Sequence, residues 1–292
     1  MRTSIVAALL LVACGGASSA PPPVRISAND VAVQPDEPEA SPEPVALVRR
    51  HTADATYRNS IVIYLSDVIG LGQSFRYRFG GPLEVARRAD GRFDAVQRFD
   101  EATMMLNDRV VSAQIDMDGL RRTASRYVVD ERNRIDPHLV TTEGTTPQNA
   151  LFVDEVFEAM RFVRVTLPPE AVVPGESWHG ERFTWDTRPF GWVVVTVEPR
   201  FALVGVEERD GRRIARVRWD AAVRLEPFSA MGLDLEGEGT VHGFSDIDLS
   251  DGLTSNIDLD GTVGLRAVGT RPGAQPAMTV NLKLDQQITP LD

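Results

Sequence analysis

The sequence has a single cysteine, and its acidic residues outnumber its basic ones. Cys14 is the only cysteine in 292 residues, so the chain cannot form an internal disulfide bond. With 42 Asp and Glu against 31 Lys and Arg, the formal net charge is -11, which excludes a general electrostatic attraction to nucleic acid or to anionic lipids. The 42% of hydrophobic residues still suffices for a buried core, and it excludes a chain that is disordered throughout.

Long hydrophobic runs are also scarce near the N-terminus. The apolar stretch at residues 5–11 follows one positive charge, Arg2, and is too short to cross a bilayer as a helix. This arrangement predicts a signal peptide over residues 1–13. Its end, Leu11-Val12-Ala13-Cys14, resembles the lipobox of bacterial lipoproteins. The resemblance implies cleavage before Cys14 and acylation of its thiol, and several acyl chains anchor a protein on a membrane essentially permanently.

Residues 14–50 have no aromatic side chain and are rich in proline. Seven prolines fall in residues 15–50, so this segment is expected to build no core of its own and to act as a disordered tether. A proline-rich chain rises about 3.1 Å per residue, which gives a reach of the order of 100 Å from the membrane. Gly15 replaces the aspartate that retains enteric lipoproteins at the inner membrane, so by analogy the outer membrane is favoured. We expect the folded domain to span residues 51–292.

From about residue 56, short apolar alternations separated by turn residues predict a mainly β, antiparallel fold. Phe75, Tyr77 and Phe79 alternate with arginines, and a second alternation covers residues 111–117. Asp118-Gly119 then supplies a hairpin signal, because glycine accepts the positive φ of a tight turn. The same dipeptide recurs, at hairpin turns or bulges, at Asp90-Gly91, Asp210-Gly211, Asp251-Gly252 and Asp260-Gly261.

One stretch has helical rather than strand periodicity. Thr146-Pro147 resembles an N-cap followed by proline at the first helical position, and apolar residues then recur at helical spacing. We expect an amphipathic helix over about 148–162 that packs on the sheet as a lid, in preference to a groove for a partner. A proline-containing crossover follows, so the domain divides into two sub-parts, about 51–145 and 177–290.

The C-terminal sub-part shows one consistently apolar sheet face. The alternation around residue 219 and the next candidate strand suggest a register in which Arg224 lies opposite Asp234. A concave apolar face of this kind is a candidate surface for a hydrophobic ligand, with plain core packing as the alternative. The candidate ligand-binding residues share the apolar parity: Trp219, Val223, Leu235, Val263 and Leu282.

This organisation resembles the half-barrel of the outer-membrane lipoprotein carriers and acceptors. The segments Leu167-Pro168 and Pro174-Gly175-Glu176-Ser177-Trp178 are also similar to segments of other periplasmic lipoproteins. The resemblance implies a curved antiparallel sheet around one helix, with a concave face that can hold acyl chains. No binding residue is carried over from it, and the soluble carriers differ in lacking a lipid anchor.

Searches for catalytic and metal-binding patterns are negative. The run Gly175-Glu176-Ser177-Trp178-His179 departs from a nucleophile elbow, because its fifth position is not glycine and no helix pattern follows. A calcium-loop pattern beginning at Asp246 fails because its glycine is one position late and its twelfth residue is Ile257. If Asp246 faced Asp258, exposure of both carboxylates would be the simplest arrangement, with a bridging cation as the alternative. The four histidines lack zinc-ligand spacing, so we expect no enzyme, cofactor or metal.

Two functional hypotheses remain. The first is a non-enzymatic envelope lipoprotein, anchored through Cys14, that binds a hydrophobic ligand on the concave sheet face or serves as a structural module. The second is an interaction protein that uses the acidic C-terminal sheet face, since residues 226–292 contain eleven acidic and three basic side chains. Asp234, Glu236 and Glu238 would then contact an envelope protein partner.

Overall fold

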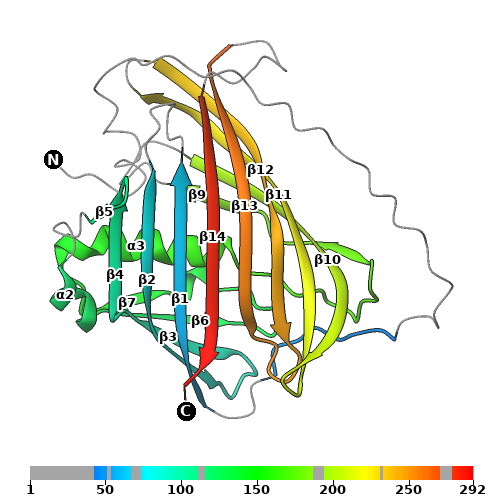
Figure 1. The fold of residues 1–292 in the computed structure, drawn as a ribbon. Coiled ribbons are helices and arrows are strands. Elements are labelled where there is room, and N and C mark those ends of the chain that lie inside the picture. The colour runs from blue at the N-terminus through cyan, green and yellow to red at the C-terminus, as the bar shows by residue number, and fades with distance from the viewer. Residues whose placement is uncertain are drawn as a thin grey trace.

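A computed structural model describes residues 43–50, 54–66, 74–110, 116–186, 194–230, 233–269 and 278–291. Its strands form one large, strongly curved antiparallel sheet that does not close into a barrel (Figure 1). The expected mainly β fold with a packing helix is confirmed. The strands carry the alternation that predicted them: Phe75, Tyr77 and Phe79 are buried, while Arg76 and Arg78 between them are exposed.

The hydrogen-bonded order of the main sheet path is β7-β6-β3-β2-β1-β14-β13-β12-β11-β10-β8, with β4 and β5 attached through β2 and with β9 attached to β10. The strands are β1 (Ala55–Ser66), β2 (Phe75–Arg87), β3 (Phe93–Arg98), β4 (Glu101–Leu106), β5 (Arg109–Val110), β6 (Ala124–Val129), β7 (Thr141–Glu143), β8 (Ser177–His179), β9 (Phe183–Asp186), β10 (Val194–Arg209), β11 (Arg212–Ala230), β12 (Leu233–Asp248), β13 (Thr254–Ala267) and β14 (Met278–Pro290).

The two predicted sub-parts belong to one sheet. Strand β1 pairs with β2 on one side and with the last strand, β14, on the other. In this second pairing Asn59 lies opposite Ile288, so residues from the two ends of the described chain are neighbours. The sheet is therefore continuous across the crossover that separates the two sub-parts in sequence.

Helix α3 (Pro147–Phe162) confirms the predicted helix, and it crosses one face of the sheet (Figure 1). Val153, Phe157 and Met160, spaced three to four residues apart, are buried in one hydrophobic cluster with side chains of β1 to β4 and β6. The rings of Phe157 and Tyr127 meet edge to face, with centroids 5.3 Å apart. The helix thus lies in the concavity of the sheet, as a lid would.

The chain that follows α3 covers the other half of the concave face. Val163, Val165 and Leu167 are buried and belong to a second hydrophobic cluster that includes Phe201 and Trp219. The crossover is therefore part of the core rather than a surface connection.

The hairpin predicted at Asp118-Gly119 is wrong. These residues lie in the short helix α2 (Met117–Arg122), and the Asp116 side chain caps it by accepting a hydrogen bond of 2.9 Å from the Gly119 backbone N–H. An aspartate-glycine pair fits a first helical turn as well as a hairpin. Most of the alternation that preceded it, residues 111–115, lies outside the described residues.

The other aspartate-glycine pairs behave mostly as expected. Gly91, Gly211 and Gly252 have φ of 86°, 73° and 71° in the turns between consecutive strands. Gly261 instead lies inside β13 and does not have a positive φ.

The register suggested for Arg224 and Asp234 is wrong. Arg224 lies opposite Glu238, because the ladder between β11 and β12 continues to the pair Ala230–Leu233, and counting back from this pair leaves Asp234 opposite Ser229. Asp246 lies opposite Asn256, whereas Asp258 faces Asp285 of β14. The register of two strands depends on where their pairing begins and on bulges, and the pattern within one strand does not indicate either.

The packed part of the chain begins before the boundary predicted at residue 51. Leu47 and Arg49 are only 1% and 5% exposed. Val45 forms an antiparallel bridge with Val172. The predicted signal peptide, Cys14 and the remainder of the tether up to residue 42 lie outside the described residues.

Candidate functional site

The five predicted ligand-binding residues lie on the concave side of the sheet. Trp219, Val223 and Leu235 are buried, and Val263 and Leu282 are half-buried against the same hydrophobic clusters. Sequence parity therefore placed all five on one face. Their binding of a ligand stays a prediction.

Trp219 is the most enclosed of these residues. Its ring contacts Phe162, at the end of α3, with centroids 5.5 Å apart, and Phe201 of β10 at 6.2 Å. The indole Nε1 is buried, and no described residue forms a hydrogen bond with it. A ligand that reached Trp219 would have to displace Phe162, and hence the C-terminal end of α3.

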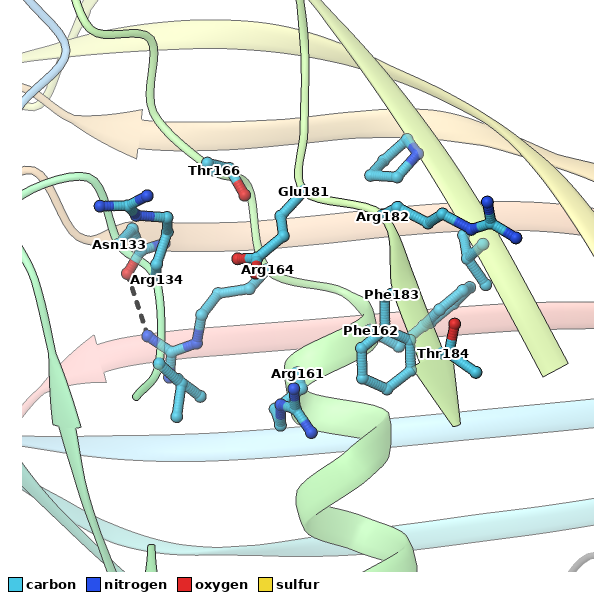
Figure 2. A pocket seen from close by; sticks show the side chains of 13 residues that line it. Asn133, Arg134, Arg161, Phe162, Arg164, Thr166, Glu181, Arg182, Phe183 and Thr184 are labelled. Atoms are coloured by element: carbon cyan, nitrogen blue, oxygen red, sulfur yellow. Dashed lines mark hydrogen bonds between the residues drawn. The ribbon is translucent and has the colours of Figure 1, made fainter. Parts of the chain in front are cut away.

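A pocket of about 90 Å³ opens beside that end of α3 (Figure 2). In this view, Asn133, Arg134 and Arg164 lie on one side, and Phe162, Phe183 and Thr184 on the other. The pocket is lined by Asn133, Arg134, Ile135, Arg161, Phe162, Arg164, Thr166, Glu181, Arg182, Phe183, Thr184, Val197 and Pro199.

Three of the four arginines that line the pocket have carboxylate partners. Arg161 pairs with Glu158 at 2.9 Å, and its guanidinium also stacks 4.9 Å from the centre of the Phe183 ring. The other two pairs join Arg134 to Asp130 at 2.7 Å and Arg182 to Glu198 at 3.6 Å.

Arg164 differs from these three. It donates hydrogen bonds to Asn133 Oδ1 at 2.9 Å and to the Tyr127 hydroxyl at 3.3 Å. Within the described ranges, no carboxylate lies within 4.0 Å of its guanidinium. Its Nε is buried and has no hydrogen-bond partner among the residues that the structure describes.

Arg49 lies behind Arg164 and contacts the same amide. It donates a hydrogen bond of 2.9 Å to Asn133 Oδ1, and its Nε is likewise buried without a partner. Burial, and next the positive charge of Arg164, lower the pKa of Arg49 to about 10. Sequence reasoning missed this pair because Arg49 falls in the segment predicted as tether.

The aspartates of the calcium-like loop are buried and neutralised. Asp246 and Asp248 are each 5% exposed, and they pair with Arg209 at 3.0 Å and with Arg212 at 3.5 Å. The expected exposure of Asp246 is therefore wrong, and Arg209 of β10 neutralises this buried carboxylate. In the part of the chain that the structure describes, no three His, Cys, Asp or Glu side chains gather as metal ligands would.

The elbow-like run forms an ordinary edge strand. Ser177, Trp178 and His179 make up β8, which pairs with β10. The Trp178 Nε1 donates a hydrogen bond of 2.7 Å to the Thr166 carbonyl, which fixes the strand on the crossover. His179 is exposed within this strand rather than in a turn.

The acidic C-terminal face is partly neutralised by one arginine. Arg266 of β13 binds Glu236 at 2.9 Å and Glu238 at 2.6 Å. Asp234 is exposed and accepts a hydrogen bond from Ser229. Two of the three residues predicted to contact a partner are therefore already engaged within the sheet.

Comparisons with known proteins add no relative. No protein-family model matches the sequence, and no curated protein matches it significantly. None of the helices in the described ranges is long and apolar enough to cross a membrane.

Proposed function

We propose that this chain is a non-enzymatic lipoprotein of the bacterial cell envelope, anchored at the outer membrane through Cys14, that binds a hydrophobic ligand on the concave face of its sheet. The observation that carries the proposal is the position of α3, an amphipathic helix held by apolar side chains inside an unclosed sheet. The predicted residues around Trp219 line the same concave face.

An acyl chain can replace the apolar contacts that α3 makes with the sheet. The side chains that join them, Val153, Phe157 and Met160, are held by hydrophobic burial, which is non-directional. No described strand pairs with α3, so the helix can move without breaking the backbone ladders of the sheet. An acyl chain that takes the place of α3 would keep the same sheet residues out of water.

The lipobox-like end of the signal peptide supports the membrane location. A single cysteine at Cys14 leaves acylation as the role that fits its position, and the proline-rich segment after it provides distance from the membrane. The folded domain would then reach lipids near the membrane surface while it stays anchored.

Mass spectrometry of the full chain, extracted from membranes in mild detergent, tests both parts. Under denaturing conditions we expect a mature chain that begins at Cys14 and carries covalent acyl groups. Under native conditions we expect an additional lipid mass that denaturation removes, because the ligand is not covalently bound. The Cys14→Ser variant should lose the covalent acyl mass and the membrane association.

The membrane anchor and the bound ligand can be refuted independently of each other. An unprocessed chain with a free Cys14 thiol in the cytosol would refute the anchor. A clean native mass, together with no binding of a fluorescent fatty acid, would refute the ligand.

A further inference from the structure

Two positive charges meet at one neutral amide in the interior of this acidic protein. The guanidinium groups of Arg49 and Arg164 each donate a hydrogen bond of 2.9 Å to Asn133 Oδ1. Neither group has a carboxylate within 4.0 Å among the residues that the structure describes. The shared acceptor carries only a partial negative charge. The carboxylate of Asp251 favours the charged form of Arg49, but burial and the charge of Arg164 outweigh it, because the pKa of Arg49 is still lowered.

The burial of these groups makes the missing negative charge costly. Arg49 is 5% exposed, and in the described part of the chain the buried Nε atoms of both arginines have no hydrogen-bond partner. Buried donors in native proteins almost always have partners, and a charged one pays a large desolvation cost. An anion next to Arg164 would supply both the acceptor and the charge.

The pocket beside Arg164 has the size and the lining for such an anion. Its volume of about 90 Å³ is well below the roughly 300 Å³ at which pockets for drug-sized molecules begin, so it admits a small polar group and excludes an acyl chain. Its lining includes the hydroxyl-bearing side chains of Thr166 and Thr184. It also includes one carboxylate, Glu181, whose negative charge opposes an anion, but the four arginines of the lining outnumber it. The other three arginines of the lining are paired with carboxylates, which leaves Arg164 as the lining cation without one.

We propose that this pocket binds a compact oxyanion, specifically a phosphate group, with Arg164 as the contacting residue and Arg49 as the buried positive charge behind it. Guanidinium groups match phosphate because they offer several N–H donors in a planar fork. The phosphate comes either as the free ion or as the headgroup of a lipid. The pocket does not depend on the proposed function, because a free anion would bind whether or not α3 yields to an acyl chain.

A purely structural role for the cluster makes a different prediction. Asn133 has a positive φ of 64°, and its Nδ2 donates to the Val165 carbonyl at 3.0 Å, which ties the turn to the crossover. Asn133 makes that tie itself, and the tie needs no positive charge at residue 164. If the cluster were only structural, Arg164→Gln would lower the stability of the fold, and the unmodified chain would not bind phosphate.

Calorimetric titration of the full chain in detergent with sodium phosphate, at constant ionic strength set with chloride, tests the proposal. We expect saturable binding to the unmodified chain and a dissociation constant at least about tenfold higher for Arg164→Gln, since one charge-assisted hydrogen bond accounts for that factor. Arg182→Gln is the matched control, because Arg182 lines the same pocket but pairs with Glu198. It should bind phosphate within about twofold of the unmodified chain.

A melting-temperature measurement on the unmodified chain tests the same site and does not depend on the folding of a variant. Phosphate should raise the melting temperature of the unmodified chain, while chloride at equal ionic strength should not, because a ligand of the folded state alone stabilises it. Titration with dihexanoyl phosphatidylglycerol distinguishes the sources. Tighter binding of this lipid than of inorganic phosphate assigns a headgroup, and equal or weaker binding assigns the free ion. Absence of binding by both, or an unchanged dissociation constant in Arg164→Gln, would overturn the proposal.

Discussion

At the scale of single residues, three buried amides join strands that are distant in sequence. Asn59 of β1 donates to Gln97 Oε1 at 2.9 Å and accepts from Gln286 Nε2 at 2.8 Å. All three side chains are at most 6% exposed. Gln97 completes the network by donating to the Arg98 carbonyl at 2.6 Å. The amides thus connect β3 and β14 through β1, where the two sub-parts meet.

Replacement of Asn59 by leucine should lower the free energy of unfolding by about 2–4 kcal/mol, because it leaves a buried acceptor on Gln97 and a buried donor on Gln286 without partners. Urea denaturation followed by circular dichroism measures this change. The control is Thr289→Ala, an exposed position on β14, which should stay within about 0.5 kcal/mol of the unmodified chain. A loss below about 1 kcal/mol for Asn59→Leu would show that water or neighbouring groups satisfy the amides.

The sequence did not indicate this network or the arginine pair at Asn133. Each depends on which residues face one another across strands or turns far apart in the chain, and residue 286 is 227 positions from residue 59. Alternation reveals which face of a strand is buried, but it does not distinguish registers that differ by an even number of residues. The apolar residues of the concave face were predictable because their burial follows from parity alone.

At the scale of secondary structure elements, the helix and most strands were predictable, since the period of the apolar residues differs between the two. The exceptions have local causes. The side chain of Asp116 caps a helical turn at Asp118-Gly119, and the pairing of Ala230 with Leu233 sets a register in which Arg224 lies opposite Glu238. Strands β12 and β13 also approach each other closely at glycine positions, which alternation does not indicate.

Gly239 is the clearest case of this close approach. A Cβ at this position would lie 2.1 Å from the Thr262 carbonyl oxygen and 2.7 Å from the Val263 Cα, both backbone atoms of β13. Gly239→Ala must therefore push the two strands apart, and we expect a loss of about 1–3 kcal/mol in the free energy of unfolding. Thermal or urea denaturation measures the loss.

Gly205 in β10 provides the control for the alanine substitution itself. A Cβ there meets no atom within 4 Å, so Gly205→Ala should be neutral or slightly stabilising, since it restricts the unfolded chain. Equal effects of the two substitutions would show that glycine flexibility, rather than strand proximity, governs stability at these sites.

At the scale of the whole molecule, the N-terminal segment 43–50 holds the two hydrophobic clusters and the crossover together. Leu47 is buried in the cluster that contains Trp219, while Arg49 stacks 5.3 Å from the centre of the Phe93 ring. The backbone of this segment bonds to three separate parts of the chain, through Val172, Glu131 and Asp251. Composition suggested a tether here because the segment lacks aromatic residues, and tertiary contacts override that local signal.

A chain that begins at Glu43 should therefore be markedly more stable than one that begins at His51. Loss of the buried Leu47 side chain alone lowers the free energy of unfolding by about 2–4 kcal/mol, because its contacts within the core are lost and a cavity remains. Scanning calorimetry of both truncated chains, with Leu47→Ala and the exposed-site control Arg50→Ala in the longer one, separates burial from chain length. The Leu47→Ala chain should fall most of the way toward the shorter chain, and Arg50→Ala should not, since the contact of residue 50 with Asp251 is made by its backbone N–H. Equal melting temperatures for the two truncated chains would mean that the segment only rests on a sheet that is already stable without it.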